Sequence, residues 1–90
     1  MRIHLLLPRP GKEDMDIPLS LVNGKTSFTL NSAGNPHVFK VTFDGQTLEV
    51  TDYTGKQETF MNVAIGQRFD CKFLTLQLKT VNFALAIREG

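Results

Sequence analysis

Short stretches in which apolar and polar residues alternate recur along the chain, and glycines separate them at nearly even intervals. These glycines lie ten or eleven residues apart, at positions 24, 34, 45, 55 and 66. Strands separated by turn residues about every 8–12 positions are typical of all-β sandwiches and barrels. The sequence therefore predicts a single all-β domain over residues 1–90, a β-sandwich or partly open β-barrel of about eight mostly antiparallel strands.

The alternation also places the individual strands. Those predicted in the first two thirds of the chain cover residues 2–7, 16–22, 26–30, 37–43, 46–51 and 57–65. The segment 8–14 is predicted to be a loop, since Pro8 and Pro10 cannot donate to a β-ladder. Asn23-Gly24 predicts a two-residue type I′ turn, and the strands on either side of it are expected to pair with each other.

Residues 67–89 contain neither glycine nor proline, and they alternate in three runs. The alternation slips after Phe73 and again near Lys79-Thr80, and each slip predicts a bulge, bend or turn. A helix competes with strands here, because several apolar residues also follow helical spacing. The strict alternation and the frequent Thr and Val favour strands.

The stretch from Val81 to Ile87 carries no charge. An exposed edge strand is normally protected by charges, proline or a bulge, and this stretch has none of them. It is therefore predicted to be a central strand or a strand at a homo-oligomer contact. Apolar residues in both phases around Leu6 and Ala84 likewise predict strands that are covered on both faces.

Composition narrows the class of protein. The chain has 90 residues, a formal net charge of +1 and one cysteine, Cys71. This balance gives no global field that would attract nucleic acid or anionic lipid. An intramolecular disulfide is impossible, so a reducing, cytoplasmic setting is expected. The apolar run at the N-terminus is far shorter than the ~20 residues that span a bilayer, and we expect no membrane partner.

The residues that commonly carry chemistry do not form a recognisable constellation. His4, His37 and Cys71 lie far apart in the sequence, without the spacing of a zinc site. His37 is expected to open a strand and meet water, and Cys71 to be a small buried hydrophobe. The acidic run 13–16 is expected to be a solvated loop, because it lacks the spacing and glycine of a calcium loop. The serines have no nucleophile-elbow context. No catalytic, cofactor-binding or metal-ligating residue is therefore predicted, and no cofactor.

These observations favour a non-enzymatic binding or structural module, an adaptor or assembly subunit that contacts protein through an open sheet edge. The alternative is a small β-barrel that binds single-stranded nucleic acid, ranked lower because the phenylalanines follow the core phase and no aromatic binding motif is present. A hydrolase or lyase whose site assembles at an oligomer interface is a third alternative. The sequence resembles no known family.

Overall fold

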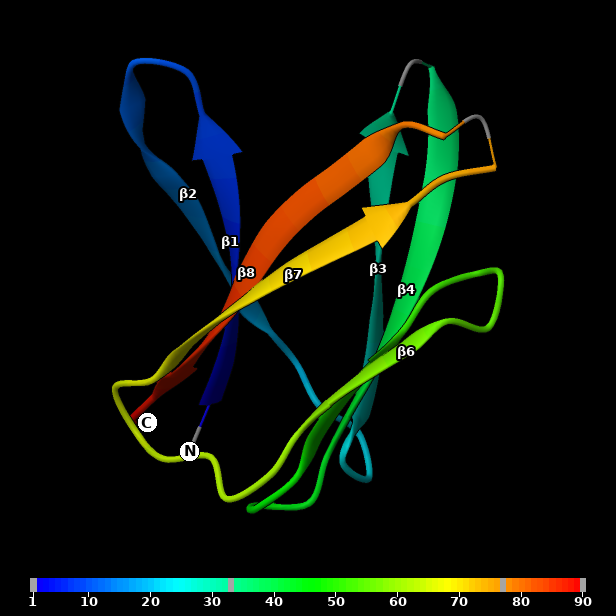
Figure 1. Ribbon diagram of the computed structural model, residues 1–90. Helices are drawn as coiled ribbons and strands as arrows, with labels where there is room; N and C mark the ends of the chain where they lie inside the picture. Colours follow the sequence, from blue (N-terminus) through cyan, green and yellow to red (C-terminus); the bar gives the residue numbers. More distant parts are fainter. Residues whose placement is uncertain (1, 33, 77, 90) are drawn as a thin grey trace. The chain divides into compact units, whose positions relative to one another are not determined.

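The computed structural model describes residues 2–32, 34–76 and 78–89. In this part of the chain there are eight strands and no helix, and every strand pair is antiparallel (Figure 1). The strands are β1 (Arg2–Arg9), β2 (Lys12–Leu19), β3 (Lys25–Ser32), β4 (Asn35–Phe43), β5 (Leu48–Thr51), β6 (Gln57–Phe60), β7 (Arg68–Leu74) and β8 (Thr80–Arg88). The predicted all-β class and strand number are confirmed. No helix in the described residues is long and apolar enough to cross a membrane.

The first unit of the chain is a four-stranded sheet with the order β2-β1-β8-β7. Its centre is β8, in which every residue from Phe83 to Ile87 is buried. Ile3 faces Ile87 and Leu5 faces Leu85 across the β1–β8 ladder, and all four side chains are almost completely buried. The prediction of a central strand is therefore confirmed, and the competing helix is replaced by β7 and β8.

The second unit is a four-stranded sheet with the order β3-β4-β5-β6, so that each strand pairs with the next along the chain. Phe39 and Val41 of β4 alternate with exposed or half-buried residues, and so do Leu48 and Val50 of β5. These four side chains are buried, and the ring of Phe28 stacks on Phe39 with centroids 5.4 Å apart. The alternation of apolar and polar residues in the sequence thus gives this sheet one apolar face and one polar face.

The predicted type I′ turn is present. Asn23 and Gly24 both have positive φ values, 53° and 73°, and Val22 and Lys25 exchange two backbone hydrogen bonds around them. The predicted pairing of the flanking strands is wrong, however. The ladder ends with the bridge from Val22 to Lys25, because β2 pairs with β1 in the first sheet and β3 pairs with β4 in the second.

The predicted loop over residues 8–14 is also wrong. β1 continues through Pro8 to Arg9, and β2 begins at Lys12, so that only Pro10 and Gly11 form the turn. The ladder has an irregularity between Leu7 and Arg9, where the proline lies, and such irregularities accommodate a residue that cannot donate. Gly11 supplies the positive φ that the short turn needs.

Two aspartates organise the turns on either side of β5. Asp44 Oδ1 accepts hydrogen bonds from the amides of Gln46 and Thr47. Asp52, which is buried, accepts three bonds on Oδ1, from both the amide and the hydroxyl of Thr54 and from the amide of Lys56. Short acceptor side chains of this kind replace the backbone partners that a tight turn cannot supply.

The predicted strand 57–65 is shorter in the structure, ending at Phe60. Asn62 has a positive φ of 57°, which is incompatible with a continuing strand. The second parity slip in residues 67–89 corresponds to the β7–β8 turn. It is closed by a hydrogen bond of 2.7 Å from the Thr75 amide to the Lys79 carbonyl.

We expect Gly24→Ala to destabilise the fold more than an alanine at another glycine with positive φ. A Cβ at Gly24 would lie 2.8 Å from the Phe43 carbonyl oxygen, whereas a Cβ at Gly55 would meet nothing within 4 Å. The backbone strain of Gly55→Ala lowers the unfolding free energy by ~1 kcal/mol. The added clash at Gly24 brings the loss for Gly24→Ala to ~2 kcal/mol or more. Urea unfolding of both variants measures the difference, and equal losses would contradict this account of the turn.

Candidate functional site

One face of the first sheet carries most of its charged side chains, and we call it the charged face. It lies opposite the face that holds Ile3 and Leu5, as the strand register requires. Among its residues from the four strands are Arg2, His4, Leu6, Asp14, Asp16, Arg68, Asp70, Lys72, Asn82, Ala84, Ala86 and Arg88. The charged face therefore combines a polar network with three small or apolar residues at its centre.

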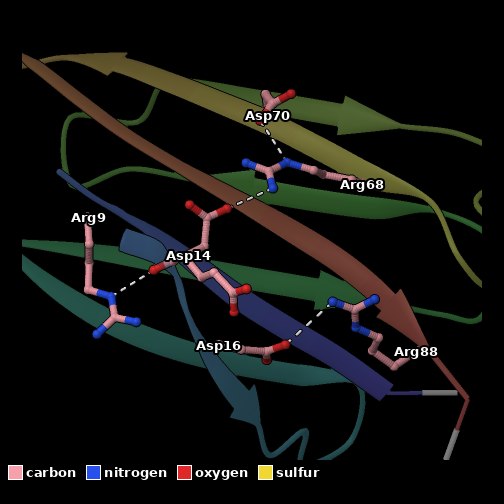
Figure 2. A network of polar contacts seen from close by, with 7 residues as sticks. Arg9, Asp14, Asp16, Arg68, Asp70 and Arg88 are labelled. Atoms are coloured by element: carbon pink, nitrogen blue, oxygen red, sulfur yellow. Dashed lines mark hydrogen bonds and ion pairs between the residues drawn. The ribbon is translucent and has the colours of Figure 1, made fainter. Parts of the chain in front are cut away.

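Arg68 joins the two outer strands of the sheet. Its Nη1 donates to Asp14 Oδ2 at 2.8 Å and its Nε donates to Asp70 Oδ1 at 3.2 Å (Figure 2). Because Asp14 is on β2 and Arg68 on β7, the ion pair reaches across β1 and β8. The hydrogen bond to Asp14, followed by that to Asp70, raises the pKa of Arg68 above its ordinary value.

A small apolar cluster lies on the same face, on the strands that the ion pair crosses. It consists of Leu6, Ala84 and Ala86, all of them buried. The carbon stem of an arginine covers apolar surface while its guanidinium reaches a polar partner, and the two alanines leave room for such a stem. The second apolar phase of β1 and β8 is thus buried as well as the first.

The other end of the charged face holds a second group of interacting side chains, those of His4, Asp16 and Arg88. His4 Nδ1 lies 2.5 Å from Asp16 Oδ1. Arg88 Nη2 lies 3.4 Å from Asp16 Oδ2 (Figure 2). The hydrogen bond with His4 is the main reason why the pKa of Asp16 lies below its ordinary value, and Arg88 adds to the effect. Among the described residues, no group of three or more His, Cys, Asp and Glu side chains could hold a metal ion.

A hollow of about 420 Å³ opens at the β7 side of the charged face, lined in part by Pro8, Asp70, Lys72 and Asn82. Lys72 is exposed, and it makes no ion pair with any residue that the structure describes. The thiol of Cys71, which also lines the hollow, is buried. The hollow therefore combines charged and polar groups with the apolar Pro8 and Phe83, and the thiol of Cys71 is buried.

The β7–β8 turn presents the most exposed apolar side chains of the first sheet. Leu74, Leu76 and Leu78 are 44%, 73% and 77% exposed, and we call them the leucine tip. The turn is held by the buried Thr75, whose amide donates to the Lys79 carbonyl and whose hydroxyl accepts from the Lys79 amide. Leu76 and Leu78 thus lie between two residues, Thr75 and Lys79, that are joined by hydrogen bonds.

Sequence reasoning missed the leucine tip, because Leu74, Leu76 and Leu78 alternate as a buried strand would. The second parity slip nevertheless lies at Lys79, and Thr75, whose hydroxyl can bond to a turn, comes shortly before it. The positions of the network residues were likewise missed, since Asp14 and Arg68 are separated by 54 positions and only the strand order brings them together.

The individual residues considered from the sequence have different outcomes. Cys71 is buried, as predicted. The expectation that His37 meets water is wrong, because His37 is buried with its ring 5.1 Å from that of Tyr53. It shares the strand phase of Phe39 and Val41, which the alternation had indicated. The acidic residues 13–16 lie in β2 and not in a loop.

The Asp16 contact predicts an acid-sensitive contribution to stability. A carboxylate with a lowered pKa in the folded state stabilises above the unfolded pKa of ~3.9 and loses that effect as the pH falls through the folded pKa. The unfolding free energies of the wild type and Asp16→Asn should therefore differ above pH ~4 and converge below it. Urea titrations at several pH values measure this, with Glu89→Gln as the control. A difference that does not change with pH would contradict it.

Comparisons with known proteins do not assign this chain to a family. No protein-family model, no curated protein and no solved structure matches the chain. The features of the structure that bear on its function are the charged face, the hollow and the leucine tip.

Proposed function

We propose that this chain is a non-enzymatic protein-binding module, an adaptor or assembly subunit, and that the leucine tip is its contact with the partner. The observation that carries the proposal is the exposure of Leu76 and Leu78 on a turn held by hydrogen bonds. The lone cysteine forms no disulfide, which suits a reducing compartment such as the cytoplasm.

The apolar area in water explains why a protein partner is preferred. Leaving a leucine exposed forgoes most of the roughly 1.5–3 kcal/mol that burial of such a side chain typically yields. Single exposed leucines are ordinary, but clustered exposed apolar residues mark interaction sites. Because Thr75 and Lys79 already join the ends of the turn, less entropy is lost on binding than for an open loop, and more of the free energy of burying these side chains appears as affinity.

The backbone at Leu78 gives independent support. Leu78 has a φ of 60°, a left-handed conformation that costs an L-residue roughly 1–2 kcal/mol. The other described non-glycine residues with positive φ are Asn23 and Asn62, and asparagine tolerates this region far better. Glycine or asparagine would suit the turn at position 78. A strained leucine that is also exposed contributes little to folding, and this combination is typical of functional sites.

The nucleic-acid alternative has less support on the charged face. Phosphate binding needs cations that are available, whereas Arg68 and Arg88 are engaged by carboxylates. The phenylalanines of β7 and β8 lie in the opposite phase from these arginines, so they offer no stacking surface beside them. Retention on single-stranded DNA that weakens with salt would favour this alternative over protein binding.

Relief of the strain at the leucine tip provides the first test. We expect Leu78→Gly to raise the unfolding free energy by up to ~1 kcal/mol, because glycine adopts the positive φ freely and the lost side chain is mostly exposed. Urea unfolding measures the change, and Leu74→Gly is the comparison in a β-strand, where glycine is destabilising. A loss of stability in Leu78→Gly would show that this leucine serves the fold.

Protein binding is tested by capture from the native host with the wild type and with Leu76→Asp/Leu78→Asp. The variant should lose a specific protein that the wild type retains, since two buried carboxylates would oppose docking in an apolar pocket. Met61→Asp is the matched control, because Met61 is equally exposed, 73%, but lies outside the leucine tip. Identical captured proteins from all three chains, each with an unchanged melting temperature, would refute the proposed contact.

A further inference from the structure

The two outer strands of the first sheet differ in how they are protected against pairing with another chain. β2 carries Pro18, and its ladder with β1 is irregular near the turn. β7 runs from Arg68 to Leu74 without a proline, and its register with β8 is regular over all seven residues. Proline and irregular pairing are the usual devices that block an edge strand. In this sheet only β2 has them.

The hydrogen bonds of the β7–β8 hairpin show which backbone groups of β7 point outward. Thr75 donates to Lys79, and the Ile87 amide donates to the Gln67 carbonyl. Because paired residues alternate between bonded and non-bonded positions, the odd-numbered residues of β7 direct their amides and carbonyls toward β8. The even-numbered residues from Arg68 to Leu74 direct theirs away from the sheet, where another strand would find them.

We propose that β7 pairs antiparallel with β7 of a second copy of this chain, around a two-fold axis at Cys71. Residue 71 is the midpoint of the strand, so this register pairs all seven residues of each copy. It places Asp70 opposite Lys72 of the second copy, and Lys72 opposite its Asp70. On the other face, Phe69 lies opposite Phe73 of the second copy, a favourable aromatic cross-strand pair.

The charged side chains of β7 favour this register over the two registers in which the axis is shifted by one residue. A two-fold axis perpendicular to the sheet keeps both charged faces on one side, so even-numbered residues must face even-numbered ones. An axis at Asp70 would oppose two aspartates and set Arg68 against Lys72. An axis at Lys72 would oppose two lysines. Like charges directly opposite each other are destabilising, whereas the axis at Cys71 gives two opposite-charge pairs.

The second copy also completes the network on the charged face. Lys72 on an edge strand would ordinarily discourage pairing, and it makes no ion pair among the described residues of its own chain. Asp70 is largely exposed, at 78% of its side chain, and is held by Arg68 on one side. Lys72 of the second copy would extend the row from Asp14 through Arg68 and Asp70. The lysine thus excludes the wrong registers while favouring the matched one.

Sedimentation equilibrium over a range of chain concentrations tests the proposal. The wild type should form dimers, and Lys72→Glu should raise the dimer dissociation constant about tenfold or more, because it creates two pairs of like charges. Asp70→Lys should weaken the dimer similarly. An equimolar mixture of Lys72→Glu and Asp70→Lys chains should form a mixed dimer at concentrations where neither variant dimerises alone, because both facing pairs then have opposite charges.

A matched charge change on the opposite edge of the sheet serves as the control. Lys12→Glu alters β2, the other outer strand, and should leave the dimer unchanged. Circular dichroism and a melting curve show that each variant is folded. A monomeric wild type, or a dimer that Lys72→Glu strengthens, as an axis at Asp70 would require, overturns the proposal. Leu76 and Leu78 lie beyond the end of β7, so Leu76→Asp/Leu78→Asp should still dimerise and either proposal can fail alone.

Discussion

The first sheet depends on the burial of β8 on both of its faces. A strand buried on both sides reads as a continuous apolar run, and Phe83 to Ile87 is such a run. One face is filled by large side chains in register with β1. The other holds only alanines and Leu6, and the ion pair between Arg68 and Asp14 crosses the sheet above these strands. An exposed ion pair is worth little in free energy by itself. Its geometry matters more here, because it joins two outer strands that share no backbone hydrogen bond.

The second sheet is organised locally instead. Its strands follow one another in sequence, so each needs only a tight turn to find its partner. The Asp44 carboxylate binds the amides of Thr47 and Gln46, and these bonds hold the pKa of Asp44 below its ordinary value. Asp52 organises the next turn from a buried position. Neighbouring strands joined by capped turns have low contact order, which favours rapid formation of this sheet. The first sheet must instead bring together segments from both ends of the chain.

These two modes of organisation explain what the sequence could predict. Alternation and turn residues predicted the all-β class, most strands and the Asn23-Gly24 turn, because those features are determined within a few residues. Pairing was predicted wrongly at that same turn, since a turn does not determine how far its strands stay together. His37 was misplaced because it follows Asn35-Pro36 and was expected at the exposed start of a strand, whereas β4 already begins at Asn35 and His37 has the buried phase of Phe39. The partners of Arg68 depend on strand order, and no local pattern encodes that order.

Both proposed contact surfaces lie on the β7–β8 hairpin, and the architecture gives a physical reason for this. β8 is fixed by ladders on both sides, so β7 and the turn are attached to a strand that cannot move independently of the sheet. A contact surface loses least entropy on binding when its support is rigid before the partner arrives. The outward backbone groups of β7 and the side chains of the leucine tip are therefore supported by β8 and need no stabilising contacts of their own. The strain at Leu78 is tolerable for the same reason, because Thr75 and the β8 ladder hold the turn closed.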